Sequence, residues 1–307
     1  YNIASTMNRL LILIIAITSL TGMNLHADSY FPYPAVPESL PVGRARANYI
    51  VEHFWDHCPW KSAFSSHKKM ENALREYAEI FPLAAADTVF ASIDNLIDKV
   101  SKRPKDLVEL TRMAEALFYA DSAYFPNEEI YARFATAASK HKKTPAADRE
   151  RLKRQIQVIN HSKEGAALPA IPMTLADGST IMLNDTTDAY SGEYILIFDI
   201  PDSPDGRMER LFLQANASAS ALIESEWIKP IFIYPGTPDQ SWWKALENVP
   251  QKWIVAALPQ AFDYFDLRHL PNVYIVDSNK VIPRTNLTIP FMIQTCEEIM
   301  NQIRREQ

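Results

Sequence analysis

An apolar strand, a polar turn and a helix follow one another at residues 194–214, and this order constrains the fold more than any other stretch. Residues 194–198 (Tyr-Ile-Leu-Ile-Phe) form an apolar run that favours a strand buried on both faces. Residues 199–206 are dominated by Pro, Asp, Ser and Gly and predict a turn. Apolar side chains then recur at helical spacing at residues 208, 211, 212 and 215. Because the free N–H groups at a helix start stabilise an anion, such a frame can carry a reactive group.

The turn resembles the redox turn of a thioredoxin-like domain of the TlpA/AhpC-TSA type. In envelope members of that family from gut-type bacteria, a Pro-Asp pair precedes Cys-x-x-Cys and the helix, and Pro201 and Asp202 match this pair. The two cysteine positions fall on Ser203 and Gly206, so the resemblance implies the fold without its redox pair. The candidate residues of this degenerate redox turn are Pro201, Asp202, Ser203, Pro204, Asp205 and Gly206.

Nothing in the turn replaces the two thiols. Thiol–disulfide exchange needs one thiolate that attacks a sulfur and a second thiol that resolves the mixed disulfide. Ser203 can do neither, and we expect its side chain to cap the helix. A hydrolase built on Ser203, His269 and a carboxylate is a remote alternative, since no base flanks the serine in sequence. No catalytic residue is therefore predicted.

A second landmark is the apolar run headed by Pro271, at residues 270–282, with an Asp-Ser-Asn-Lys turn and an expected return strand. It resembles the thioredoxin-like hairpin in which a cis-proline stands beside the redox turn. The resemblance implies a cis peptide at Leu270–Pro271 and backbone groups that can pair with an extended peptide. The candidate residues of this peptide groove are His269, Leu270 and Pro271.

The remainder of residues 166–307 alternates strand and helix patterns, which predicts a central, partly parallel sheet. Asp177-Gly178 predicts a hairpin within residues 173–183. The closing helix is expected to turn Phe291 and Cys296 inward. The further expected elements are helices at 207–223, 239–246 and 290–305 and strands at 228–234 and 253–257.

Residues 28–165 are dominated by helical patterns separated by prolines, which predicts an all-helical domain. The expected helices are 44–55, 70–81, 87–101, 106–119, 128–141 and 146–161. The start of this region has Arg44, then Tyr49, then His53-Phe54-Trp55-Asp56, downstream of a lead rich in Tyr and Pro. It resembles the start of a DUF5106 domain, which implies a helical domain ahead of a thioredoxin-like one and no known activity.

The predicted fold class is α + α/β, with an N-terminal all-helical domain and a C-terminal thioredoxin-like three-layer α/β domain at residues 166–307. Residues 10–20 are apolar and follow Met7-Asn8-Arg9, which predicts a signal peptide over residues 1–27 with its start at Met7. Eleven apolar residues are too few to cross a bilayer comfortably, so no stable membrane span is expected after removal of the signal. We expect export to the periplasm or cell envelope of a Gram-negative bacterium.

Composition excludes several function classes. With 7 Gly in 307 residues and no glycine-rich motif, a phosphate-binding loop is not expected. The net charge is −6 and no basic patch is interleaved with aromatics, so nucleic acid is not an expected partner. His53 and His57 are four residues apart, but Phe54 stands where a metalloprotease has its glutamate. No metal or other cofactor is predicted.

The sequence thus favours an exported, redox-inactive thioredoxin-like protein that binds an envelope protein or peptide, in a binding or chaperone-like role. One alternative is a thiol–disulfide oxidoreductase that uses Cys58, Cys296 or a partner's thiol. The other is a glycan-binding module that uses exposed tryptophans. The tryptophans considered for this role are Trp55, Trp60, Trp242 and Trp243.

Overall fold

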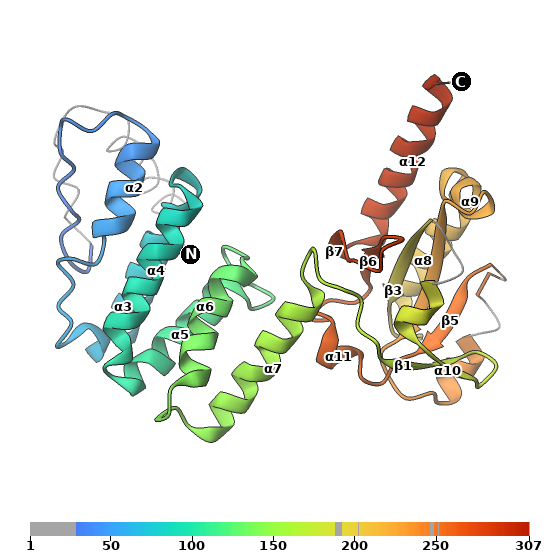
Figure 1. Ribbon diagram of the computed structural model, residues 1–307, viewed down its shortest axis with the longest axis horizontal. Helices are drawn as coiled ribbons and strands as arrows, with labels where there is room; N and C mark the ends of the chain where they lie inside the picture. Colours follow the sequence, from blue (N-terminus) through green and yellow to red (C-terminus); the bar gives the residue numbers. More distant parts are fainter. Residues whose placement is uncertain (1–28, 188–191, 202, 246–248, 251, 307) are drawn as a thin grey trace. The chain divides into compact units, whose positions relative to one another are not determined.

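The computed structural model describes residues 29–187, 192–201, 203–245, 249–250 and 252–306 (Figure 1). Contacts between Cα atoms divide the chain into two compact units, with the division after Lys153. The predicted signal peptide lies outside the described residues. Across the described part of the chain, no helix is both long and apolar enough to cross a membrane.

The first unit is helical, as predicted. From residue 29 onward, six α-helices occur where the periodic patterns place them, each within a few residues of the expected ends. The last of them, α7, continues past Lys153 into the second unit. The α-helices are α2 (Arg44–His53), α3 (His67–Ala78), α4 (Ala86–Ser101), α5 (Pro104–Phe118), α6 (Glu128–Lys140) and α7 (Ala146–Ser162), and the short 3-10 helices are η1 (Ala63–Ser65) and η2 (Phe81–Leu83).

Aromatic side chains fill the core of the first unit. Phe31, in the Tyr- and Pro-rich lead, is buried, and its ring centroid lies 5.6 Å from that of Phe54 and 5.5 Å from that of Trp55. The hydroxyl of Tyr77 donates to Ser92 Oγ at 2.6 Å, and Ser92 in turn donates to the Val51 carbonyl at 2.7 Å. The lead is therefore anchored by an inserted aromatic ring, and the buried hydroxyls have partners.

The second unit is built on a seven-stranded sheet of order β2-β1-β5-β4-β3-β6-β7. The pairs β3–β4 and β4–β5 are parallel and the other pairs are antiparallel, so the predicted partly parallel sheet is confirmed. The strands are β1 (Pro172–Leu175), β2 (Thr180–Met182), β3 (Glu193–Phe198), β4 (Ile228–Tyr234), β5 (Ile254–Ala257), β6 (Asn272–Val276) and β7 (Arg284–Leu287).

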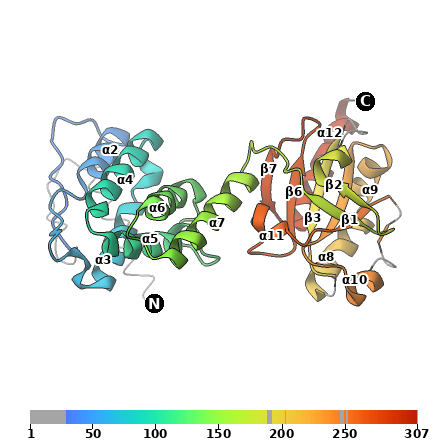
Figure 2. The same ribbon diagram turned by 60° about the horizontal axis from the view of Figure 1, so that its bottom comes forward.

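Strand β3 lies inside the sheet and is buried on both faces, as its apolar run predicts. Ile195 and Ile197 join a cluster with Leu213, Leu222 and Met292 from the helices on one face. Tyr194, Leu196 and Phe198 join the cluster on the opposite face. Helices α9 and α12 pack side by side in both views (Figures 1 and 2). The helices are α8 (Pro204–Ala215), α9 (Ala217–Glu224), α10 (Gln240–Ala245), α11 (Ala261–Tyr264) and α12 (Ile289–Glu306), and a 3-10 helix, η3 (Leu183–Thr187), precedes β3.

Three sequence predictions for this unit are wrong in detail. The expected helix 207–223 is two helices, because Asn216 ends α8 and caps α9 by accepting from Ser218 N and Ala219 N. The return strand is β7, while Val281 makes only an isolated bridge with Ala167. Phe291 is exposed rather than turned inward, although Cys296 on the same helix is buried as expected.

Candidate functional site

The predicted turn and the predicted proline loop meet at one end of the sheet, where strand β3 ends and strand β6 begins. Strands β3 and β6 are antiparallel, and Phe198 pairs with Asn272. The turn begins directly after Phe198, and Pro271 directly precedes Asn272, so both segments emerge at the same place. The Leu270–Pro271 peptide bond is cis, which confirms what the resemblance implied.

Ser203 caps helix α8, as predicted. Its Oγ accepts a hydrogen bond from Gly206 N at 3.2 Å, and Pro204 occupies the first turn, where a missing N–H costs nothing. The backbone N–H of Ser203 donates to the Ile200 carbonyl at 3.0 Å and closes the turn. Asp202 and the side chain of Asp205 lie outside the described residues. The serine hydroxyl therefore has a structural partner at the helix start.

Asp199 and Arg210 form a buried ion pair beneath the turn. Asp199 is completely buried, its Oδ2 pairs with the Arg210 guanidinium, and its Oδ1 accepts from Ile200 N at 2.7 Å. Arg210 also donates to the Pro201 carbonyl at 3.3 Å and lies 4.7 Å over the Phe232 ring. Burial lowers the pKa of Arg210 to about 10, so it stays charged at neutral pH. The pair joins the end of β3, the turn and α8.

The same carboxylate requires a glycine at residue 206. A Cβ atom added at this residue would lie 2.6 Å from Asp199 Cγ and 2.7 Å from Asp199 Oδ1. A side chain at residue 206 is therefore incompatible with the position of Asp199. Ser203 and Gly206, the two residues predicted to stand at the cysteine positions, thus serve the helix start, one as a cap and the other as space for a buried carboxylate.

The cis-proline loop is held by its own contacts. Arg268 Nε donates to Asp266 Oδ1 at 2.7 Å. The Asp266 carbonyl accepts from Asn272 Nδ2 and from Tyr274 Oη, each at 2.9 Å. The side chain and the carbonyl of Asp266 are therefore both used in hydrogen bonds that hold the loop. The Ser203–His269 hydrolase is not supported, because the serine hydroxyl is used as the cap and His269 lies on the surface.

An apolar stripe on α8 faces solvent next to the turn. Helical spacing of apolar residues ordinarily marks the buried face of a helix. Here Met208, Leu211 and Phe212 are 48%, 46% and 59% exposed, while Leu213 on the inner face is 1% exposed. Ile200, in the turn itself, is 49% exposed. Sequence spacing revealed these residues, but the direction in which they face required the structure.

Cys58 and Cys296 are both buried free thiols. Burial raises the pKa of Cys58 to about 12, and the nearby cations Lys99 and Arg103 only partly offset this effect. Burial and the neighbouring Glu297 raise the pKa of Cys296 to about 11. A reactive thiolate requires a lowered pKa, so neither cysteine has the properties of a nucleophile.

The tryptophan and histidine candidates are mostly occupied in packing. Trp55 and Trp242 are buried, so the glycan-binding alternative loses two of its four residues. Trp243 is 46% exposed, and its ring centroid lies 4.5 Å from that of Trp242. His53 Nδ1 lies 2.7 Å from Asp56 Oδ2.

The helical half of the chain matches a known family. Residues 15–162 match the family described as DUF5106, a domain of unknown function. A comparison with curated proteins finds no match. The resemblance of the segment at residues 44–56 to this family is therefore confirmed.

Solved structures show the fold of the rest. A thioredoxin-like protein from Bacteroides caccae has a TM-score of 0.71 at 20% identity, over 88% of this chain and 99% of that one. The C-terminal domain of an uncharacterised Bacteroides fragilis protein gives 0.41 at 18% identity, over 45% and 99% of the two chains. The thioredoxin domain of a Bacteroides vulgatus thiol-disulfide oxidoreductase gives 0.38 at 19% identity, over 45% and 97%. The likeness to the Bacteroides caccae protein shows that the second unit of this chain has a thioredoxin-like fold.

Proposed function

We propose that this protein binds a protein or peptide through the surface formed by its turn, the exposed stripe of α8 and the cis-proline loop, without redox chemistry. The observation that carries the proposal is the solvent exposure of Ile200, Met208, Leu211 and Phe212 beside the turn. Exposed apolar groups that gather in one place are typical of interaction sites. In this segment, four large apolar side chains lie within thirteen residues of the chain.

The turn itself supports binding rather than catalysis. Its two cysteine-equivalent residues are a helix cap and a glycine packed on Asp199. The Asp199–Arg210 pair and the contacts of Asp266 hold the turn and the proline loop in place. A surface that is already ordered loses less entropy when a ligand binds. Backbone groups beside Pro271 offer a place for an extended segment to pair.

We further propose that the protein works in the cell envelope of a Gram-negative bacterium. This proposal rests on the signal-peptide pattern of residues 7–27. A chaperone-like role would follow if the bound segments are apolar stretches of exported proteins.

A peptide selection tests the proposed surface. Peptides chosen from a random library against the full chain would be measured by fluorescence anisotropy on the wild type and on Leu211→Ser/Phe212→Ser. We expect the double variant to weaken binding by about tenfold or more, because apolar anchors dominate such interfaces. Phe262→Ser is the matched control, since Phe262 is 54% exposed but lies on α11, which packs against the other sheet face. Equal affinity of the wild type and the double variant would contradict the proposed surface.

A further inference from the structure

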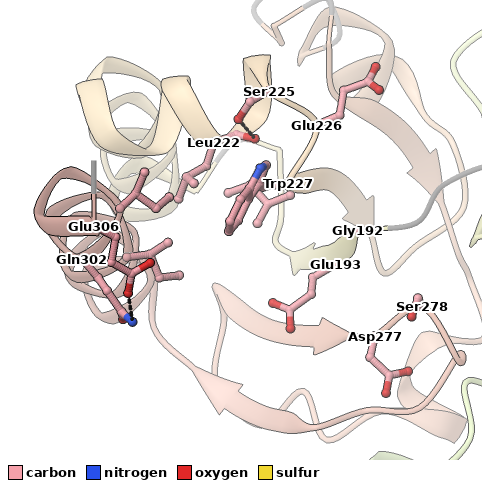
Figure 3. Close-up of a pocket in the computed structure, with 13 residues that line it drawn as sticks. Gly192, Glu193, Leu222, Ser225, Glu226, Trp227, Asp277, Ser278, Gln302 and Glu306 are labelled. Atoms are coloured by element: carbon pink, nitrogen blue, oxygen red, sulfur yellow. Dashed lines mark hydrogen bonds between the residues drawn. The ribbon is translucent and has the colours of Figure 1, made fainter.

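A pocket lies at the end of the sheet opposite to the turn, where β3 begins and β6 ends. It has a volume of about 870 Å³, and Gly192, Trp227 and Asp277 lie on its walls. Figure 3 shows residues of α9 and α12 on one side and the start of β3 on the other. This volume falls in the range of pockets that hold small molecules, roughly 300–1,000 Å³.

Trp227 supplies an aromatic wall. Its backbone is fixed, because its N–H donates to the Leu222 carbonyl at 2.9 Å and its carbonyl accepts from Glu193 N at 3.1 Å. Its side chain is nevertheless 55% exposed and stands between Leu222 and Glu193 in Figure 3. Ile299 and Ile303 of α12 extend the apolar wall. An exposed indole on a fixed backbone that faces an open cavity has the geometry of a binding surface rather than of core packing.

The remaining wall is negatively charged. Glu193 and Glu306 reach toward the interior from opposite sides, and Asp277 stands at the rim (Figure 3). The described residues that line the pocket include no Lys, Arg or His. Burial raises the pKa of Glu193, and repulsion by the nearby Asp277 carboxylate adds to this effect. A cation placed between them would relieve that repulsion.

The carboxylates are spread around the pocket rather than gathered at a point. Within the part of the chain that the structure describes, no three His, Cys, Asp or Glu residues are grouped closely enough to hold a metal ion. The pocket therefore offers separated negative charges with an aromatic and aliphatic floor. An ammonium group over the face of a tryptophan is attracted to the ring, and a methylene stem packs against it.

We infer that this pocket binds a small organic cation, an alkylammonium compound with an aliphatic stem. The ammonium groups pair with Glu193 and Glu306, and the stem lies on Trp227 and the α12 isoleucines. The site is separate from the proposed peptide surface, so either proposal can fail without the other.

Isothermal titration calorimetry on the full chain tests this inference. The probes are 1,8-diaminooctane, the neutral isostere 1,8-octanediol and the anion octanoate. We expect the diamine to bind, the diol to bind at least about tenfold more weakly and octanoate not to bind, with diamine affinity falling as salt is added. Equal binding of the diol, or no binding of the diamine, overturns the inference. Tetralysine that binds more tightly than the diamine also overturns it, because the occupant would then be a peptide.

Matched variants locate the site. Glu306→Gln should weaken diamine binding by about fivefold. Glu298→Gln is its control, because Gln294 bonds Glu298 at 2.9 Å as Gln302 bonds Glu306 at 3.0 Å, four residues apart on the same helix. Trp227→Leu should weaken binding by about threefold or more, and Trp243→Leu, at a tryptophan outside the pocket, should leave it unchanged. Circular dichroism would confirm that each variant is folded. Equal effects of each variant and its control would overturn the assignment to this pocket.

Discussion

At the scale of single residues, the turn is organised around Asp199. The carboxylate is buried, paired with Arg210 and bonded to the Ile200 N–H, and it leaves no room for a side chain at residue 206. A buried carboxylate without its partner would be costly, which explains why the arginine accompanies it. Ser203, Gly206 and the Asp199–Arg210 pair thus all stabilise the start of helix α8.

Gly206→Ala should destabilise the protein. At a helical residue with room for a methyl group, this substitution normally stabilises by about 0.4–1 kcal/mol. Here the new Cβ would overlap the Asp199 carboxylate, so we expect a loss of about 1–3 kcal/mol in the free energy of unfolding. Urea unfolding followed by circular dichroism measures the change. An increase in stability would show that Asp199 can move aside and that the packing account is wrong.

The two thiols should stay unreactive in the folded protein. Because burial raises the pKa of Cys58 to about 12 and that of Cys296 to about 11, both remain neutral below pH 9. We expect no iodoacetamide labelling of the native protein from pH 7 to pH 9, as read by intact mass. Full labelling in guanidinium chloride, where the thiol pKa returns to about 8.5, is the control. A native thiol that labels at pH 7 would revive the oxidoreductase alternative.

At the scale of elements, α8 differs most from what its sequence suggests. The spacing of residues 208, 211 and 212 correctly predicted a helix, but these side chains face solvent while Leu213 and Arg210 face inward. A period of 3.6 residues fixes which side chains share a face, not which face meets the sheet. The break at Asn216 was also missed, because a capping asparagine within a continuous helical pattern gives only a weak local signal.

The two faces of α8 should respond differently to substitution. Phe212→Ser should change the free energy of unfolding by no more than about 0.5 kcal/mol, because the side chain is already in water. Leu213→Ser, at the neighbouring residue, should cost about 2–5 kcal/mol, because its side chain is buried in the core. Chemical unfolding of both variants checks this contrast. Similar losses in the two variants would mean that the stripe on α8 is covered.

At the scale of the whole molecule, the elements that are strongly periodic or resemble a known motif were predictable from sequence. The helical first region, the buried β3 and the cis bond at Pro271 are all as expected. The pairing of Asp199 with Arg210 was not, because the two residues lie eleven apart and meet only when α8 packs on the sheet. The pocket beside Trp227 was also missed, since its walls come from the starts of β3 and β4, from α9 and the segment after it, from the turn after β6 and from α12.

We propose that this chain, with its thioredoxin-like fold, recognises a partner by surface contact and not by sulfur exchange. The most direct measurement captures partners from native cell-envelope extract with three baits and compares them by quantitative mass spectrometry. The baits are the wild type, the Cys58→Ser/Cys296→Ser variant and the Leu211→Ser/Phe212→Ser variant. We predict that the cysteine-free bait retains the same partner as the wild type and that the α8 variant loses it. A partner that the cysteine-free bait loses and the α8 variant retains would contradict the claim.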